Sequence, residues 1–426
     1  MDKKAIILQG RNNIELAEKH MGALMKLREN FAKTKPFKGL KIGMALHITK
    51  ETAVLVRTLI DGGARVAITS CNPLSTQDDV AEALRADGIP AFGYKGETPR
   101  EYYSFLYKVL DTKPNITIDD GCDLVSEVHL KRPALMRDII GGCEETTTGI
   151  NRLHAMESDK ALKYPIIAVN DNKTKHLMDN YYGTGQSTID GIIRATNILF
   201  AGKTVVVAGY GDCGKGCSMR AKGLGANVVV TEVDPFCGLQ ARMDGFRVMP
   251  MGEACKIGDI FITVTGNKHV IRVEHARAMK NGAILANSGH FDVEIDVAGI
   301  EKAATQKKRI RPFMTRYTLA RGKEVYVLAD GRLVNLSAAE GHPSEVMSMS
   351  FCGQALACEY LVQHNGGSVS GGRSGGKNPL KPGVHYLPES IDQKIASLQL
   401  EVMGVKIDKL TPEQVKYLGG WREGTN

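Results

Sequence analysis

One stretch of the sequence, residues 204–232, orders its residues in a way that few folds accommodate. An apolar β-branched run, TVVVAG, leads into the glycine loop GYGDCGKG, and a helix-like stretch and a second apolar run, NVVVTE, follow. A strand, a glycine-rich turn, a helix and a second strand form one βαβ unit of a parallel sheet. The sequence therefore predicts an α/β fold.

The glycine loop satisfies two phosphate-binding patterns at once. Gly209, Gly211 and Gly214 have the spacing of a dinucleotide-binding G-x-G-x-x-G. Gly209, Gly214 and Lys215 also fit most of the P-loop pattern G-x-x-x-x-G-K-[ST]. A P-loop needs a hydroxyl after the lysine to ligate magnesium, and Gly216 has none, which weakens the triphosphate interpretation. A tight turn without a ligand is the plain alternative.

An acid in the right place favours the dinucleotide interpretation. Glu232 ends the second apolar run, about 20 positions after the loop, where a carboxylate accepts the ribose 2′-hydroxyl. Because this carboxylate repels a 2′-phosphate, NAD is favoured over NADP. Gly209 permits the tight turn, Gly211 lets the backbone approach the pyrophosphate, and Gly214 lets the helix pack close to the strand.

The bulk composition excludes several classes of protein. The chain of 426 residues is long enough for two or three domains, and 43% hydrophobic with 24% charged residues is ordinary for a globular protein. The net charge is +8, and the densest basic run, 306–316, has no aromatic interleaving beyond Phe313, so we predict a solvated surface and no nucleic-acid binding. The first residues do not form a signal peptide, and no apolar stretch approaches the length of a spanning helix, so we expect no membrane association.

The cysteines point to a reducing compartment. There are nine of them, dispersed without a C-x-x-C pair, which suggests neither a disulfide framework nor a zinc site. We therefore expect a cytoplasmic protein.

Strand-like and helix-like runs alternate along 40–120, and the alternation restarts at the glycine loop. This pattern predicts two doubly wound parallel sheets of Rossmann-like type, with the cofactor on the second. Residues 344–364 read as one long helix with one apolar face, and the Gly/Ser-rich 366–379 as a mobile loop. In the tail, 390–404 and 411–420 look helical.

Polar residues gather where the predicted strands end, which is where functional residues of such sheets lie. Asp119 and Thr148 have helix capping as an equal alternative. Lys175 and Asp179 are four apart, so a helix brings them to one face, although a surface ion pair is the default for this spacing. Strand ends of the first unit carry His47, Thr49, Cys71, Asn72, Asp119 and Asp120.

Three histidines lie at predicted strand ends or loops: His47, His290 and His342. Each alone is more typical of a turn, but together they favour proton transfer. No two of them have the spacing of metal ligands, so we predict no metal site.

At this point the chain resembles a known family. Twelve segments in order, among them DDGCDL, EETTTG, NSGHFDVEID and GHPSEVMSMSF, closely resemble S-adenosyl-L-homocysteine hydrolases from about residue 10 to about residue 420. The resemblance implies a cytoplasmic homotetramer of one-carbon metabolism that retains NAD and reversibly splits this nucleoside thioether into adenosine, a purine nucleoside, and homocysteine. It also implies a substrate-binding domain, 1–183 completed by 344–385, an NAD-binding domain, 184–343, and an oligomerisation tail, 386–426.

The resemblance assigns roles to individual residues. Lys175 accepts the 3′-hydroxyl proton, with Asp179 beside it and Asn180 orienting the group. Glu145 binds the ribose hydroxyls, and Asp120 abstracts the C4′ proton. The remaining catalytic residues, which act at the sulfur and the incoming water, are His47 and the assisting His290.

The resemblance also implies the binding residues. The purine pocket is expected from Thr49, Glu51 and Gln77, with His342 as a gate. The expected cofactor contacts are Thr146, Thr147, Thr148, Gly209, Gly211, Asp212, Gly214, Glu232 and Asn335.

The chain departs from the family pattern at several places. Thr184, Gly185 and Gln186 replace Cys-Arg-Glu, and Cys237 replaces an asparagine beside the cofactor ribose. The tail lacks the Lys and Tyr that reach a neighbouring NAD site. Glu340 replaces a methionine near the purine, which makes S-inosyl-L-homocysteine, the hypoxanthine analogue, a substrate hypothesis.

Two other classes remain as alternatives. An NAD-dependent hydroxy-acid dehydrogenase shares the glycine loop but would show an arginine and histidine constellation instead of Lys175 with Asp179. A non-catalytic NAD-binding regulator would be expected to lose the proton-transfer residues, which this chain keeps.

Overall fold

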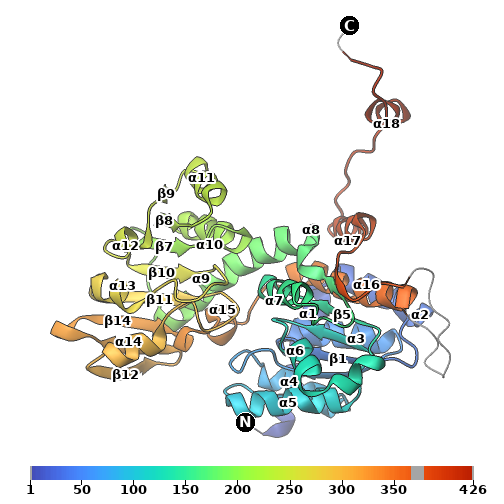
Figure 1. The fold of residues 1–426 in the computed structure, drawn as a ribbon, viewed down its shortest axis with the longest axis horizontal. Helices are drawn as coiled ribbons and strands as arrows, with labels where there is room; N and C mark the ends of the chain where they lie inside the picture. Colours follow the sequence, from blue (N-terminus) through green and yellow to red (C-terminus); the bar gives the residue numbers. More distant parts are fainter. Residues whose placement is uncertain (1, 366–378, 425–426) are drawn as a thin grey trace.

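The computed structural model describes residues 2–365 and 379–424 and arranges them around two separate sheets (Figure 1). Most of the loop predicted at 366–379 lies outside the described residues. The prediction of two wound α/β sheets is confirmed.

The first sheet has seven strands in the order β15-β6-β5-β4-β1-β2-β3, and all of its neighbours pair in parallel. Its strands are β1 Lys41–Ala45, β2 Arg65–Thr69, β3 Ala91–Phe92, β4 Ile116–Asp119, β5 Gly141–Glu144, β6 Pro165–Ala168 and β15 Gly383–His385.

Apolar clusters cover both faces of this sheet, as a doubly wound fold requires. Local signals start several helices: the Thr49 hydroxyl caps α3, and Thr98 and Glu101 form a capping box on α5. One face is covered by α1 Lys3–His20, α2 Gly22–Thr34, α3 Lys50–Asp61, α4 Asp78–Ala86 and α16 Ser344–Asn365, and the other by α5 Pro99–Asp111, α6 Asp123–Lys131 and α7 Thr147–Ser158.

The second sheet has eight strands in the order β12-β13-β14-β11-β10-β7-β8-β9. Around it lie α9 Thr184–Thr196, α10 Asp212–Gly223, α11 Pro235–Met243, α12 Met251–Ala254, α13 Val273–Ala278, α14 Val297–Ala303 and α15 Val334–Ser337. Its strands are β7 Thr204–Ala208, β8 Asn227–Thr231, β9 Arg247–Val248, β10 Ile260–Thr263, β11 Ala283–Asn287, β12 Gln306–Arg311, β13 Met314–Thr318 and β14 Glu324–Leu328.

One edge of the second sheet departs from the predicted parallel pattern. β12 pairs antiparallel with β13, and β13 antiparallel with β14. The short turn between β12 and β13 allows only a hairpin, because a parallel return needs a crossover of a dozen or more residues. Every residue of β12 is exposed, which confirms the predicted solvated basic surface for residues 306–311; such charges also protect a sheet edge.

The long helix predicted at 344–364 is present as α16, but the expectation of one apolar face is wrong. Residues 350–358 are buried all round the helix. The reason is that other elements pack around α16. They are α2, α3, β5 and α17 Glu389–Val402. A helix enclosed on all sides needs small residues and satisfied polar groups instead of a solvated face.

The tail contains both predicted helices, α17 and α18 Pro412–Leu418. α17 packs on α16 and α2, whereas α18 projects away from both sheets (Figure 1). Within residues 2–365 and 379–424, every helix is too short or too polar to span a bilayer.

Both sheets reverse their strand order at one point. In the first sheet the reversal lies between β1 and β4, and in the second between β7 and β10. Ligands of open α/β sheets bind beyond the carboxyl ends of the strands at such a switch point. His47 and Asp120 follow β1 and β4, and the glycine loop follows β7, so the topology places both sets of candidate residues at crevices.

Candidate active site

A single cavity of about 1060 Å³ is lined from the carboxyl ends of both sheets. Two predicted residues, Gly214 and Gln77, do not line it. The predicted residues that do line it are His47, Thr49, Glu51, Asp120, Glu145, Thr146, Thr147, Thr148, Lys175, Asp179, Asn180, Gly209, Gly211, Asp212, Glu232, His290, Asn335 and His342.

Lys175 is the centre of a buried polar cluster. Its Nζ lies 2.8 Å from Asn180 Oδ1, 3.2 Å from Asp179 Oδ2 and 3.8 Å from Glu145 Oε1. A further amide oxygen, Asn170 Oδ1, is 3.4 Å away. The Lys175 and Asp179 side chains are 6% and 3% exposed, so this is a buried ion pair and not the default surface pair.

A change of helix type brings these groups together. α8 (Lys173–Lys175) ends at Lys175, and the π-helix η3 (His176–Gly183) follows. The wider turn lets Lys175 reach both Asp179 and Asn180, and π-helical turns are frequent at functional sites. The backbone N–H groups of Lys173 and Thr174 donate to the Asp392 carboxylate of α17, which caps α8 and holds the start of the cluster.

The charges in the cluster support one another. Burial alone would lower the pKa of Lys175, but Asp179 and Glu145 outweigh it and raise that pKa well above its usual range. Burial would raise the pKa of Asp179, but His342 and Lys175 hold it well below its usual range. Burial raises the pKa of Glu145 to about 7, opposed in part by Lys175. Lys175 therefore carries a proton, and Glu145 titrates near neutrality.

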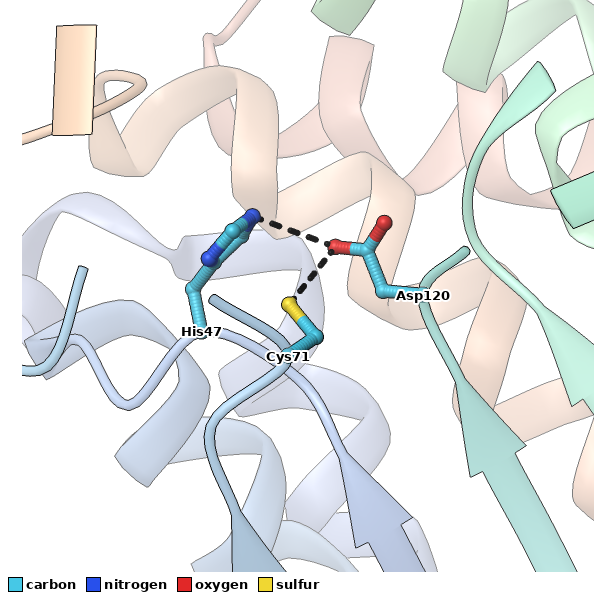
Figure 2. Close-up of side chains that lie close together, drawn as sticks. All are labelled: His47, Cys71 and Asp120. Carbon is cyan, nitrogen blue, oxygen red and sulfur yellow. Dashed lines mark hydrogen bonds and ion pairs between the residues drawn. The ribbon is translucent and has the colours of Figure 1, made fainter. Parts of the chain in front are cut away.

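A second polar cluster lies at the switch point of the first sheet (Figure 2). Asp120 Oδ2 is 3.4 Å from His47 Nε2 and 3.6 Å from Cys71 Sγ, and Asp120 Oδ1 is 3.4 Å from His290 Nδ1. His47 Nδ1 lies 2.7 Å from Ser75 Oγ, which orients the ring. Burial lowers the pKa of His47 to about 4, although Asp120 opposes this, so the imidazole is neutral at pH 7 and can accept a proton.

Two strand-end residues shape this cluster without entering the cavity. Gly121 has φ +99°, and a Cβ there would lie 2.1 Å from His290 Nε2, so only glycine fits. Asp119 accepts the backbone N–H groups of Asp120 and Val125, so its carboxylate bonds the first turn of α6, although the capping position of that helix is Cys122. Thr148 lies inside α7 and is not its capping residue, so the capping alternative is wrong there.

The predicted purine end lies on α3 and the loop before α16. Ser344 donates to Glu51 Oε1 at 2.7 Å, and the Thr49 hydroxyl caps the helix. Gln77 Oε1 accepts the backbone N–H of Lys50 at 2.9 Å, and its Nε2 donates to the Glu340 carbonyl at 3.2 Å. Gln77 therefore ties the two segments together.

The glycine loop has the shape of a dinucleotide cradle. Gly209 has φ +102°, and a Cβ on Gly214 would lie 2.0 Å from the Gly209 carbonyl oxygen. A Cβ on Gly211 would meet nothing within 4 Å, so this backbone faces open space. A side chain at Gly216 would lie 1.9 Å from the Tyr181 carbonyl oxygen, which leaves no room for the hydroxyl of a P-loop. The structure thus favours a dinucleotide over a triphosphate.

The donors around the cradle fit a dinucleotide as well. Glu232 accepts the backbone N–H of Tyr210 at 2.9 Å and still lines the cavity. Asn335 donates to Ser187, and its Oδ1 is buried without a partner among the described residues. An orphaned buried acceptor is the mark of a missing donor. The residues present therefore fit NAD.

Sequence reasoning missed several supporting residues. Ser350 and Gln354, one turn apart on α16, both donate to the Glu145 carboxylate. Asn170 accepts from Lys175 and Asn180, and Thr184 lies 3.3 Å from His342 Nε2. Two polar residues four apart in an otherwise apolar buried helix were the available signal for the first pair.

The fold and the site define a dinucleotide-dependent α/β enzyme in which a proton-transfer cluster and a cofactor cradle share one cavity. The sequence model described as S-adenosyl-L-homocysteine hydrolase matches residues 4–134, and the model of that enzyme's NAD binding domain matches residues 180–341. The chain belongs to the S-adenosyl-L-homocysteine hydrolase family, and it is an NAD-dependent hydrolase.

Relatives match over nearly the full chain. An S-inosyl-L-homocysteine hydrolase of Methanocaldococcus jannaschii is 58% identical, with 98% of this chain and 97% of the relative covered. An adenosylhomocysteinase of Aquifex aeolicus is 55% identical with the same coverage. An S-inosyl-L-homocysteine hydrolase of Methanosarcina mazei is 53% identical and covered completely on both sides. Overall identity therefore does not separate the two purines.

Proposed function

We propose that the protein reversibly hydrolyses S-adenosyl-L-homocysteine to adenosine and L-homocysteine through transient oxidation at C3′. The observation that carries this proposal is the shared cavity: the Lys175 cluster and the dinucleotide cradle line one space, so a ribose hydroxyl can reach both. When bound, NAD supplies the hydride acceptor for the 3′ carbon and returns the hydride at the end.

The oxidation explains why a hydrolase carries this cofactor. A thioether at C5′ is a poor target for direct attack by water. A ketone at C3′ acidifies the C4′ hydrogen, so a base can remove it and the thiolate can leave by elimination. Water then adds at C5′, and reduction restores the alcohol. The protein's tasks are to orient the ribose, move protons and exclude water.

The Lys175 cluster handles the 3′-hydroxyl. Because Lys175 is protonated in this arrangement, it must release a proton before it accepts one from the substrate. Glu145 is the neighbouring group proposed to take it, since its Oε1 lies 3.8 Å from Lys175 Nζ and its raised pKa makes it a stronger proton acceptor than Asp179. Asp179 stays ionised and stabilises the ammonium, and Asn180 fixes its direction.

The cluster of His47, Asp120 and His290 handles C4′ and sulfur. Asp120 is the proposed base for the C4′ proton, since its two oxygens are aligned between the two imidazoles. A neutral His47 can take a proton from the incoming water, and in the reverse reaction the protonated ring returns that proton to the departing hydroxide.

The hypoxanthine analogue is the second candidate, favoured by one observation. Lys50 Nζ lies 2.7 Å from Glu340 Oε2 and 3.6 Å from Glu51 Oε1, and Arg194 also reaches Glu340 at 3.4 Å. Glu340 thus fixes a cationic donor beside the Glu51 acceptor, and of these three side chains Glu51 lines the cavity. Hypoxanthine presents an acceptor at C6 and a donor at N1, which such a pair matches; adenine presents the reverse.

Two measurements test the proposal. Releasing and identifying the bound dinucleotide should give NAD. Thiol release from S-adenosyl- and S-inosyl-L-homocysteine, compared as kcat/KM, then decides the purine: a higher value for the adenine thioether supports the first candidate, and a higher value for the hypoxanthine thioether supports the second. Thiol release from neither substrate by NAD-loaded protein contradicts the proposal.

The domain division and the assembly belong to the same proposal. Sheet membership supports a substrate domain of 1–183 with 344–385, since β15 joins β6 in the first sheet, and an NAD-binding domain of 184–343. The tail, 386–426, is the proposed oligomerisation segment of a homotetramer. In its last part, 402–421, the apolar side chains are exposed, Ile407 by 70% and Trp421 by 86%, which suits coverage by another subunit. Light scattering coupled to gel filtration should give a tetramer.

The proposed compartment is the cytoplasm. All nine cysteines are free thiols, and seven of them, including Cys71 and Cys122, are buried without a disulfide partner. Such thiols suit a reducing compartment.

A further inference from the structure

The carboxyl ends of three neighbouring strands bring an imidazole, a thiol and a carboxylate to one point. His47 follows β1, Cys71 follows β2 and Asp120 follows β4. The three ligand atoms, His47 Nε2, Cys71 Sγ and one carboxylate oxygen of Asp120, all lie within 4.8 Å of one another (Figure 2). The sequence spacing gave no sign of this, because each residue belongs to a different βα unit.

Two of the three distances between these atoms fit the edges of a zinc tetrahedron. Zinc binds sulfur at about 2.3 Å and imidazole nitrogen or carboxylate oxygen at about 2.0–2.2 Å. With tetrahedral angles, those bond lengths place oxygen and sulfur about 3.6 Å apart and oxygen and nitrogen about 3.4 Å apart. Here Asp120 Oδ2 lies 3.6 Å from Cys71 Sγ and 3.4 Å from His47 Nε2.

Neighbouring side chains orient His47 and Asp120 toward the proposed metal position. Ser75 Oγ contacts His47 Nδ1 at 2.7 Å, which leaves Nε2 facing Asp120, and hydrogen bonds of this kind orient metal-binding histidines. The other Asp120 oxygen is occupied by His290 at 3.4 Å, which leaves Oδ2 for the ion. The His47 and Asp120 side chains are only 15% and 8% exposed, yet both line the cavity, so an ion can enter from there.

We propose that His47, Cys71 and Asp120 form a binding site for one Zn²⁺ ion. The thiolate and imidazole ligands favour zinc over the harder Mg²⁺ or Ca²⁺. On binding, Cys71 gives its thiol proton to the solution and forms the sulfur–metal bond. The fourth position faces the cavity and takes water or the sulfur of a bound thiol ligand.

The consequence is reversible inhibition, and this part of the inference rests on the proposed function. A zinc ion would occupy the lone pairs of His47 and Asp120 that the proposed proton transfers need. Zinc should therefore block thiol release, and a chelator should restore it. The proposed site is therefore one at which a soft divalent cation inhibits the enzyme. It is not a site for a permanently bound catalytic metal.

Cobalt is the probe for the first test, since a Co²⁺–thiolate bond gives a charge-transfer absorption band. NAD-loaded wild-type protein should develop this band at one Co²⁺ per chain, and Zn²⁺ should displace it. Cys71→Ser should lose the band and bind Zn²⁺ at least about tenfold more weakly by calorimetry. Cys237→Ser, the control for a half-buried thiol that lines the same cavity, should keep both. A band that persists in Cys71→Ser would overturn the site.

A second measurement needs no variant. X-ray absorption of the zinc-loaded wild-type holoenzyme should give a shell of one sulfur with nitrogen or oxygen ligands; a shell without sulfur, or with more than one, would overturn the proposal. These readouts do not depend on turnover, and thiol release in chelator-treated buffer tests the proposed function separately. Metal binding without inhibition would uphold the site and contradict the catalytic roles of His47 and Asp120.

Discussion

His342 Nδ1 hydrogen-bonds Asp179 Oδ1, although the two residues are 163 positions apart in the chain. Asp179 belongs to the π-helix beside the first sheet, and His342 lies in the loop between α15 and α16. The other His342 nitrogen lies 3.2 Å from Asn335 Nδ2, next to the cofactor cradle. This one imidazole therefore connects the proton-transfer cluster to the cofactor side of the cavity.

The first prediction concerns that connection. In His342→Ala, Asp179 loses the partner that contributes most to its lowered pKa and keeps only Lys175. We expect thiol release to fall about tenfold to hundredfold and the free energy of unfolding to fall by about 1–3 kcal/mol, because a buried acceptor loses a donor. Kinetics measures the first change and denaturant titration the second. His364→Ala is the control, because this half-buried histidine does not line the cavity. Equal losses of activity in the two variants would contradict a specific role of His342 in the reaction.

The second prediction concerns Lys175. Lys175→Ala should abolish the NADH absorbance that adenosine produces with the NAD-loaded protein and slow thiol release about 10²–10⁴-fold, the usual contribution of a positioned acid or base. Lys173→Ala is a matched control, since Lys173 lies on the same short helix with an exposed side chain paired to Glu389. A normal absorbance rise in Lys175→Ala would refute the proposed proton acceptor.

The third prediction uses two glycines with left-handed backbone. Gly121→Ala places a Cβ 2.1 Å from His290 Nε2 at φ +99°, whereas Gly88→Ala has φ +78° and meets nothing within 4 Å. Both should lose about 1–2 kcal/mol of stability from backbone strain. Only Gly121→Ala should also lose activity, because its new methyl group displaces His290 from Asp120. Unchanged thiol release in Gly121→Ala would show that His290 is not needed where it lies.

The fourth prediction is a pH dependence of stability at Glu97. This carboxyl is buried; its Oε2 accepts the Tyr94 N–H at 3.2 Å, and its Oε1 has no partner among the described residues. Burial raises its pKa to about 7. A raised carboxyl pKa favours the folded state below the unfolded pKa, and that contribution is lost as the pH rises through 7.

Glu97→Gln removes this titration. Relative to the wild type, the variant should be more stable by up to about 3 kcal/mol at pH 8, and the difference should shrink to about 1 kcal/mol at pH 5. Thermal unfolding at the two pH values measures it. Glu29→Gln, at an exposed position of α2, should show no such trend. A difference that is the same at both pH values would contradict a buried, titrating carboxyl.

Much of the fold follows from local sequence. Runs such as TVVVAG and NVVVTE on either side of a glycine loop are typical of buried parallel strands. The second sheet and its cofactor loop could therefore be predicted from the sequence. The antiparallel β12–β13 edge was missed because its polar residues lack an apolar period and depend on the sheet they join. The full burial of α16 was missed because it depends on the elements that pack around the helix. The spacing of apolar residues within one helix does not reveal those neighbours.

The site was only partly readable for the same reason. Strand-end positions indicated His47 and Asp120, since topology alone brings strand ends together. The π-helical turn after Lys175 has no sequence signature, so the burial of the Lys175–Asp179 pair could not be distinguished from a surface pair. Contacts across long separations, such as Ser350 with Glu145, need the assembled core.

The most direct test of the account is thiol release before and after removal of the bound dinucleotide. Protein stripped of NAD and checked to be folded should cleave neither nucleoside thioether, and adding NAD alone should restore cleavage. Cleavage at the full rate by stripped protein would contradict the central claim that oxidation of the ribose makes the carbon–sulfur bond breakable.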